Sequence, residues 1–277
     1  MQGKTTRVRR EAYATGTKRE CVEESGKAGF MKGLKTLFET AKENVGFLVL
    51  SVAIVVTILV VAYGAEYLIA KGRGEKRTKE KLRIHRMTLI AMLTAIAEVL
   101  MLFEIPLWFL PAFYEIDLSE LPVIIGAFTL GPVAGVTIEF LKIVLNLLIN
   151  GTATAFVGEF ANFLIGCAFV VPASIFYYAK KTKKNAIIGL VTGTVTCALV
   201  GCFLNAFVLL PAYSRAFHME MDVLIAMGTE KNSLISGMFS FVVFAVAPFN
   251  ILKCGIVSVI TLFIYKKISR LLKAGQL

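Results

Sequence analysis

Three polar side chains that interrupt apolar stretches are the residues of this sequence best suited to bind a ligand. Asn250 and Lys253 lie three positions apart in the run PFNILKCGI, so on a helix they share one face. Asn205 interrupts a second apolar run, FLNAFVLLPAY. A lysine at bilayer depth costs roughly 2.5–3.5 kcal/mol, so a polar partner, water or a ligand should receive its ammonium group. A lysine that snorkels to the surface or bonds to a neighbouring helix is the structural alternative.

The composition places these residues in an all-α polytopic membrane protein. Of the 277 residues, 57% are hydrophobic, whereas globular domains have about 45–50% apolar residues. The apolar residues come in runs of about 20, which is the length that crosses about 30 Å of hydrocarbon. The net charge of +11 could suggest nucleic acid. The basic residues cluster at the ends of the apolar runs, however, and this pattern indicates membrane topology and lipid headgroup contacts.

We expect one extra transmembrane helix followed by a six-helix membrane domain. Residues 1–44 are a polar extension with a short amphipathic helix from Phe30, and residues 45–70 are the extra crossing. Residues 71–86 form a basic linker, and residues 87–277 form the six-helix domain. The six predicted crossings are Met87–Glu104, Leu118–Leu130, Pro132–Ile149, Ala155–Ala179, Asn185–Ala212 and Val246–Leu272.

The distribution of lysine and arginine predicts the orientation of a multi-pass plasma-membrane protein. The linker holds eight basic residues, and six crossings from it place the lysines at 180–184 and at 266–273 on the same side. The three opposite connections hold only Arg215 and Lys231. By the positive-inside rule, both ends of the six-helix domain are cytoplasmic and the extreme N-terminus is outside.

Polar residues of several crossings fall at one depth, near the outer surface. At about 1.5 Å per residue, Lys253 lies about 10 Å below that surface, and Asn205 and Glu159 lie near the outer ends of their helices. Polar groups at one depth predict a pocket that is open to the outside and has apolar walls. We expect part of its wall to come from the first outer loop, which includes Leu107, the single Trp108 and Tyr114. These aromatic residues fit either a membrane-interface belt or a lid over a flat ligand.

Other charged residues have structural interpretations. Asp117 and Glu120 fit a variant capping box, and Glu159 fits the first turn of a helix, where the helix dipole favours acids. Glu139 and Lys142 lie three apart near mid-membrane, and we expect them mainly to neutralise each other.

The sequence does not predict an enzyme or a bound cofactor. It contains no G-x-x-x-x-G-K-[ST] phosphate loop, so we do not expect this chain to be an ATPase. The two histidines lie outside the crossings, and the five cysteines have no metal-binding spacing.

Five motifs in order resemble one family. The segments IDLSELP (116–122), GPVAGVTIEFLK (131–142), GEFANFLIG (158–166), FLNAFVLLPAY (203–213) and PFNILKCGI (248–256) are similar to those of riboflavin-specific substrate-binding subunits, or S components, of energy-coupling-factor (ECF) vitamin transporters. The resemblance covers about 190 residues, from about Arg83 to Leu272, and leaves residues 1–80 outside. It implies a six-helix S-component fold with a flavin pocket near the outer face, closed by the first outer loop.

The resemblance also implies roles for individual residues. Asn205, Asn250 and Lys253 would be the polar contacts to riboflavin. The loop residues that would line the pocket are Gly151, Thr152, Ala153 and Thr154. The small residues Ala91 and Ala95 would form the face that docks on a transmembrane coupling subunit, which carries two ATPase subunits. The physics agrees, because small side chains let a partner helix approach closely.

Three alternatives remain open at this point. One is an S component for another vitamin of similar size. The second is an independent ion- or proton-coupled secondary transporter, which would need inverted repeats and coupling acids. The third is a structural or signalling membrane module, which only the N-terminal extension suggests.

Overall fold

The computed structural model describes residues 42, 45–72, 80–108, 110, 114–152, 154–216 and 218–274. The expected amphipathic helix from Phe30 and residues 73–79 of the basic linker lie outside these residues. The chain divides into two compact units, of which the second, Val49–Leu277, holds nearly everything described below.

The described residues are almost entirely helical, as the composition predicts. The helices are α2 (Val45–Gly72), α3 (Glu80–Met101), α4 (Glu120–Leu130), α5 (Pro132–Asn150), α6 (Val157–Ala179), α7 (Lys183–Leu204), η1 (Asn205–Leu209), α8 (Leu210–Ala216), α9 (Met221–Lys231), α10 (Met238–Phe241), η2 (Val242–Val246) and α11 (Ala247–Ala274). In the described part of the chain, the strands are the short antiparallel pair β1 (Ile105–Pro106) and β2 (Glu115–Ile116). Six helical stretches there are long and apolar enough to cross a membrane.

Helix α4 is shorter than the other predicted crossings. Its 11 residues extend about 16 Å, which is roughly half the thickness of the hydrocarbon. All residues from Pro122 to Leu130 are buried, and the helix contacts α3, α5, α6 and α11. The second predicted crossing is therefore a short helix enclosed by the rest of the bundle.

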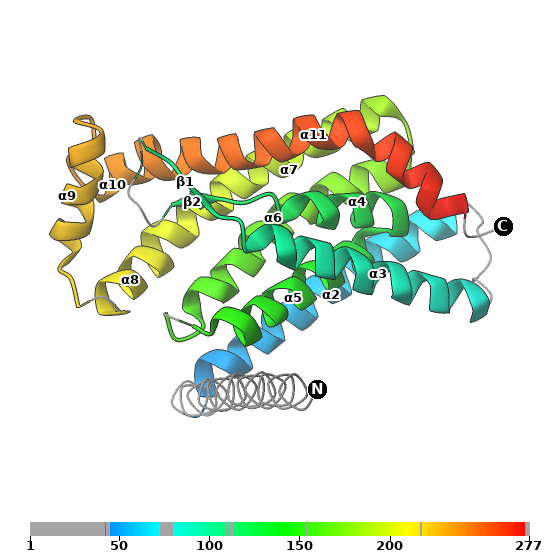
Figure 1. Ribbon diagram of the computed structural model, residues 1–277, viewed down its shortest axis with the longest axis horizontal. Coiled ribbons are helices and arrows are strands. Elements are labelled where there is room, and N and C mark those ends of the chain that lie inside the picture. The colour runs from blue at the N-terminus through cyan, green and yellow to red at the C-terminus, as the bar shows by residue number, and fades with distance from the viewer. Residues whose placement is uncertain are drawn as a thin grey trace, which may run out of the picture. The chain divides into compact units, whose positions relative to one another are not determined.

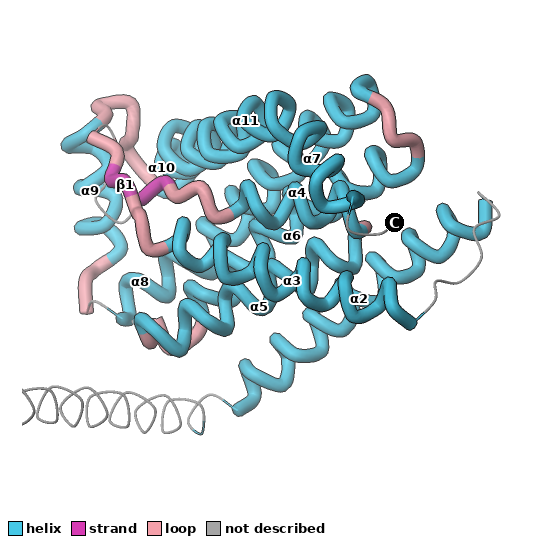
Figure 2. The backbone as a smooth tube through the Cα atoms, turned by 45° about the vertical axis from the view of Figure 1, so that its right-hand side comes forward, coloured by secondary structure: helices cyan, strands magenta, loops and turns pink. Residues whose placement is uncertain are grey.

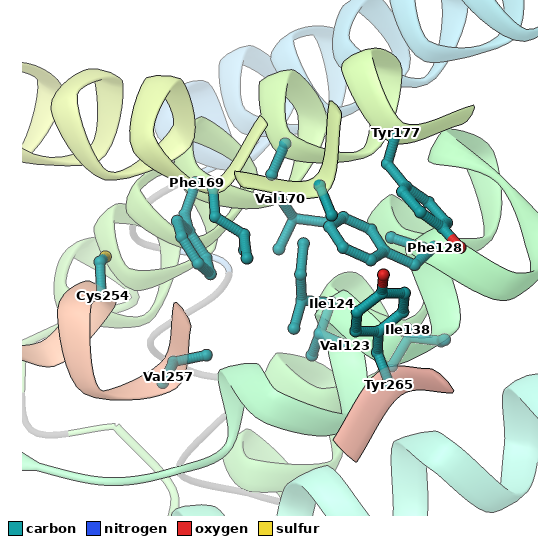
Figure 3. Packing of buried hydrophobic residues seen from close by; sticks show 14 of the residues in the cluster. Val123, Ile124, Phe128, Ile138, Phe169, Val170, Tyr177, Cys254, Val257 and Tyr265 are labelled. Atoms are coloured by element: carbon teal, nitrogen blue, oxygen red, sulfur yellow. The ribbon is translucent and has the colours of Figure 1, made fainter. Parts of the chain in front are cut away.

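An aromatic stack joins α4, α6 and α11 inside the bundle (Figure 3). The rings of Phe128 and Tyr177 stack with centroids 4.3 Å apart. Tyr265 meets both rings edge-on, at 6.0 and 5.6 Å. Such pairs contribute about 0.5–1.5 kcal/mol beyond the burial of their area. Phe128 and Tyr177 lie in the last turns of α4 and α6, so the stack packs these two helix ends against α11.

Irregular elements gather at the other end of the bundle. The views in Figures 1 and 2 agree that α8, α9, α10 and the β1–β2 hairpin lie at the end opposite the chain's C-terminus. The connection between the fifth and sixth predicted crossings thus contains a helix, α9, whose Leu224 and Gly228 are buried. Gly228 packs on the ring of Phe241 so closely that a Cβ would overlap it.

The last crossing begins at Met238, eight residues before the predicted start at Val246. A continuous helical path starts at Met238 and passes through the π-helical turn η2 before Pro248. In this turn the N–H of Ala247 donates to the carbonyl of Val242, five residues back. The same order recurs in η1, where the N–H of Leu210 donates to the carbonyl of Asn205 directly before Pro211. Proline has no N–H to donate, and a π-helical turn next to it accommodates that missing donor.

Helix α2 is attached to the six-helix core by Glu66. One carboxylate oxygen of Glu66 pairs with Arg86 of α3 at 3.1 Å, and the other accepts the N–H of Val133 at 3.3 Å. Val133 is in the first turn of α5, where free N–H groups and the helix dipole favour a negative charge. Apolar residues of α2, among them Ala62, also pack on α5 and α6. The extra helix is therefore an integral part of the bundle from Val49 on.

Replacing Gly131 tests this attachment. Gly131 has φ of +110°, and a Cβ there would lie 2.7 Å from the Glu66 carboxylate. We expect Gly131→Ala to destabilise the purified protein by about 1–3 kcal/mol, measured by thermal unfolding in detergent.

Gly64→Ala is the matched control. Gly64 is an α2 residue with nothing within 4 Å of a Cβ, and alanine favours a helix over glycine by roughly 0.5–1 kcal/mol. Equal unfolding temperatures for the two variants would contradict the proposed contact.

Candidate functional site

A cavity of about 430 Å³ lies within the bundle at the α9 end. This volume is within the range of about 300–1,000 Å³ that is typical of small-molecule sites. The lining residues come from five separated segments of the chain. They are Met101, Glu104, Tyr114, Glu115, Asp117, Thr154, Gly158, Glu159, Asn162, Ile165, Asn205, Leu209, Tyr213, Phe249, Asn250 and Lys253.

Asn205 and Asn250 are held in the cavity wall by the same device. Each side-chain N–H₂ donates to the backbone carbonyl four residues earlier, Gly201 at 2.8 Å and Val246 at 2.9 Å. Both side chains are 3% exposed. These bonds fix the rotamers, so each Oδ1 is left to act as an acceptor. The Oδ1 of Asn250 accepts a long contact from the thiol of Cys197 at 3.9 Å. The Oδ1 of Asn205 accepts the hydroxyl of Tyr114 at 2.7 Å.

Lys253 is paired with an acid that directly follows β2. Its Nζ lies 2.7 Å from Oδ2 of Asp117, and the two side chains are 14% and 6% exposed. The other oxygen of Asp117 accepts the N–H of Ser119 at 2.8 Å. Burial alone would raise the pKa of Asp117, but the ammonium groups of Lys253 and Lys142 outweigh it and hold this pKa well below its usual range. The carboxylate is therefore ionised at neutral pH.

The loop before α6 supplies hydroxyl groups around Glu159. Thr152 and Thr154 both donate to Oε2 of Glu159, at 3.1 and 3.3 Å. Thr154 also accepts the N–H of Gly158 at 2.8 Å. This turn requires Gly151 at φ +74°, a conformation that glycine adopts without steric cost.

Aromatic rings form one wall of the cavity. The rings of Tyr114 and Phe249 lie 5.1 Å apart and are tilted by 56°. Leu107 packs in the adjoining apolar cluster, although it does not line the cavity itself. Trp108 is 86% exposed and is not among the cavity-lining residues. A position on the membrane interface therefore suits Trp108 better than stacking on a ligand in this cavity.

Two further carboxylates lie at the cavity, where the hairpin reaches it. Glu104 precedes β1 and Glu115 begins β2. The pKa of Glu104 is raised to about 7, mainly because the carboxyl group is partly buried. The hydrogen bond with Glu115 and the negative charge of Glu115 raise it further. The lining thus contains four acids, Glu104, Glu115, Asp117 and Glu159, and one lysine.

The cavity brings together six of the sequence-predicted site residues: Tyr114, Thr154, Glu159, Asn205, Asn250 and Lys253. Thr152 reaches it only through Glu159. Ala153 lies outside the described residues. The sequence prediction missed Glu104 and Glu115 as lining residues, and took Asp117 mainly for a helix cap.

The predicted capping box of Asp117 and Glu120 is wrong for Glu120, which does not cap the helix. Glu120 turns into the bundle and pairs with Lys142 at 2.9 Å. The predicted pairing of Glu139 with Lys142 is present, at 2.8 Å, with both side chains fully buried. The pair is thus part of a larger cluster, for which the spacing along the sequence gave no signal.

Two other surfaces have different characters. A groove of about 540 Å³ between α2, α6 and α7 is almost wholly apolar, with Thr57 and Thr196 among its few polar residues. It offers a polar ligand no converging donors. On α3, Ala91 and Ala95 are exposed. No group of three or more His, Cys, Asp or Glu that could hold a metal is found among the described residues.

Comparisons with known proteins identify related sequences. The family model described as "ECF transporter, substrate-specific component" matches residues 85–265. Riboflavin transporter RibU of Staphylococcus aureus (strain TCH60) is 34% identical over 188 residues, which cover 68% of this chain and 92% of that protein. Riboflavin transporter FmnP of Bacillus subtilis (strain 168) is 29% identical, with 68% and 93% covered.

A solved structure is also similar. It is described as the S component of a bacterial ECF transporter, and it is 33% identical to this chain. The TM-score is 0.54, and the similarity covers 69% of this chain and 99% of the other.

The Lys253–Asp117 pair generates a prediction about stability. Asp117→Asn leaves a largely buried ammonium group without its counter-charge, which costs about 3–5 kcal/mol. We therefore expect a marked fall in thermal stability in detergent. Because the pKa of Asp117 is lowered, its contribution is present above the unfolded pKa of about 3.9 and is lost only as pH falls below it. The loss in the variant should thus stay constant between about pH 5 and pH 8.

The double variant Asp117→Asn/Lys253→Met is the control. It removes both charges, so it should recover most of the lost stability. A double variant no more stable than Asp117→Asn would show that the pair does not account for the effect.

Proposed function

The chain belongs to the family of ECF transporter substrate-specific components, and we propose that it binds riboflavin outside the cell and releases it inward. The observation that carries the proposal is the convergence of Asn205, Asn250 and Lys253 on one cavity, beside the ring pair of Tyr114 and Phe249. The names of the riboflavin transporters to which the chain is similar support this choice of ligand.

The cavity chemistry suits a flat, amphipathic ring system. The Oδ1 atoms of the two asparagines accept hydrogen bonds, and the ammonium group of Lys253 donates them. A flavin ring has an imide N–H and carbonyl oxygens on one edge, and its faces can contact aromatic side chains. The buried polar groups would therefore be paired in the complex, which is where specificity for such a ligand arises.

Tyr114 couples the hairpin to the same site. Its hydroxyl donates to Oδ1 of Asn205, so a ligand donor at this atom would exchange with the tyrosine. Tyr114 also packs on Phe241 and Phe249. This exchange would break the hydrogen bond by which Tyr114 attaches the first outer loop to the cavity wall.

We further propose that the cavity opens to the outside and that the opposite end is cytoplasmic. The basic residues at 180–184 and 266–273 and Arg86 lie at the far ends of their helices from the cavity. The positive-inside rule assigns that end to the cytoplasm. The N-terminal end of α2 would then be outside.

The energy for release would come from partners. This chain has no phosphate loop, and we assign the ATP hydrolysis to two ATPase subunits bound to a transmembrane coupling subunit. The exposed Ala91 and Ala95 form a small-residue surface on α3 that a partner helix can approach closely.

Riboflavin titration of the detergent-purified protein tests the ligand. The vitamin's fluorescence should be quenched on binding. Asn205→Ala, Asn250→Ala and Lys253→Ala should each weaken binding by about 1–3 kcal/mol, the cost of leaving a buried polar group unpaired. This corresponds to roughly a 5- to 150-fold rise in Kd.

Asn185→Ala is the control. Asn185 also donates from its side chain to a backbone carbonyl, that of Phe176, but on an exposed surface at the other end of the bundle. Its affinity for riboflavin should equal that of the unsubstituted protein. Unchanged affinity in all three cavity variants would remove the site assignment.

The four carboxylates of the cavity predict discrimination against phosphorylated flavins. The phosphate of flavin mononucleotide carries about −1.5 to −2 charges at pH 7, and only Lys253, already paired, opposes the acids in the lining. We expect weaker binding of the nucleotide than of riboflavin. Glu104→Gln/Glu115→Gln should improve nucleotide affinity by roughly tenfold, or about 1.4 kcal/mol, with little effect on riboflavin.

The pH dependence separates the contribution of Glu104 from that of the phosphate. Glu104 has a pKa of about 7, so it gains a proton as pH falls through this value and repels the nucleotide less. Discrimination should thus decline more between about pH 8 and about pH 6 in the unsubstituted protein than in Glu104→Gln. Identical pH profiles would contradict a role for Glu104.

A further inference from the structure

A second polar cluster lies behind the cavity, in the interior of the bundle. The Nζ of Lys142, on α5, lies 2.8 Å from Oε2 of Glu139 and 2.9 Å from Oε1 of Glu120 on α4. The side chains of Lys142 and Glu139 are 0% exposed, and Glu120 is 5% exposed. None of the three lines the cavity, so the binding of a ligand there does not account for them.

This cluster is continuous with the Lys253–Asp117 pair. Lys142 also donates to Oγ of Ser119 at 3.2 Å, and the N–H of Ser119 donates to Asp117. The connected groups are therefore three carboxyl groups and two ammonium groups. If every group were ionised, the cluster would carry one net negative charge inside an apolar bundle. A buried charge without a counter-charge is strongly unfavourable, and proteins usually avoid it by neutralising the group.

The surrounding helices supply no further cation among the described residues. Helix α3 contributes another acid, Glu98, which accepts the side-chain N–H of Asn146 at 3.3 Å. Helix α6 contributes Gly166 and the thiol of Cys167, and α11 contributes Lys253, which already pairs with Asp117. The excess negative charge therefore has no basic partner within the described part of the bundle.

Glu139 is the member of the cluster with the poorest set of donors. In the described structure, neither of its carboxyl oxygens accepts a well-directed hydrogen bond, although Lys142 lies close. Its Oε1 packs against the backbone of α6 at Gly166, where a Cβ would overlap it and would also lie 3.0 Å from Oε1 of Glu120. The two carboxyl groups thus share a narrow space that only a glycine leaves open. A carboxyl group that carries a proton fits this space without like-charge repulsion.

We propose that Glu139 and Glu120 together bind one proton at neutral pH, carried mainly by Glu139. The cluster is then electrically neutral, with Lys142 paired to one carboxylate and Lys253 paired to Asp117. This makes the start of α4 and the middle of α5 a proton-binding site, which is connected to the cavity lining through Ser119 and Asp117.

Infrared difference spectroscopy of the full chain tests the proposal. The unsubstituted protein at pH 7 should show the carbonyl stretch of a protonated carboxylic acid, shifted to lower frequency in deuterated water. The comparison is made in a Glu104→Gln background, because Glu104, with a pKa of about 7, is itself partly protonated at pH 7. In this background Glu139→Gln should lose the band. Glu120→Gln should lose it too, because the remaining Glu139 is then balanced by Lys142 and ionises.

Glu66→Gln and Glu98→Gln are the matched controls. Glu66 is a helix carboxylate that already pairs with Arg86, so its replacement should change only the bands of ionised carboxylate. Glu98→Gln removes the other buried acid nearby and should leave the Glu139 band in place.

Three results would overturn the proposal. The first is the absence of any protonated-carboxyl band from the unsubstituted protein at pH 7, which needs no variant to fold. The second is a band of undiminished intensity when Glu139→Gln is added to the Glu104→Gln background. The third is a large drop in the melting temperature of Glu139→Gln, since a glutamine can replace a neutral carboxyl group but not an ionised partner of Lys142. Riboflavin titration of the same samples reports separately on the cavity.

Discussion

Every polar group inside this bundle must find a partner within the protein, because hydrocarbon offers none. Asn205 and Asn250 meet this requirement locally, each by donating to the carbonyl one turn back. Lys253 meets it across the bundle, through Asp117. A ligand at the cavity therefore meets acceptors and a donor that are already oriented. Binding exchanges existing contacts for new ones, and its specificity depends on how well the new set replaces the old.

The same requirement accounts for the irregular helices around the cavity. Pro211 and Pro248 each remove a backbone donor, and in both helices a π-helical turn directly precedes the proline. Asn205 opens one of these turns, and Asn250 follows the other by four residues. A π-turn adds a residue to the helical path, so it changes which side chains face inward. Two sequence-distant asparagines reach the same cavity partly for this reason.

The sequence predicted those features that depend on local composition. Apolar runs of sufficient length determine the all-α class, and the interrupting polar residues Asn205, Asn250 and Lys253 indicate where a site would lie. Features that depend on distant pairs could not be read in this way. Asp117 lies 136 positions from its partner Lys253, and Glu120 lies 22 from Lys142. The spacing of residues along the sequence does not indicate contacts between such distant positions. A capping box, which needs only neighbouring residues, was therefore the simpler expectation for both acids. The early start of the last helix at Met238 was missed because a proline usually marks a first turn.

The two ends of the bundle differ in regularity, and this difference explains where a polar molecule can enter. At one end, the rings of Phe128, Tyr177 and Tyr265 pack together between α4, α6 and α11. At the other end, the hairpin, the π-turns and the start of α4 expose side-chain oxygen and nitrogen atoms to a cavity. In regular transmembrane helices the backbone N–H and C=O groups pair with one another, so these helices offer a ligand no free backbone donors or acceptors. A polar ligand therefore fits the irregular end, whereas the rings of the aromatic stack fill the opposite end.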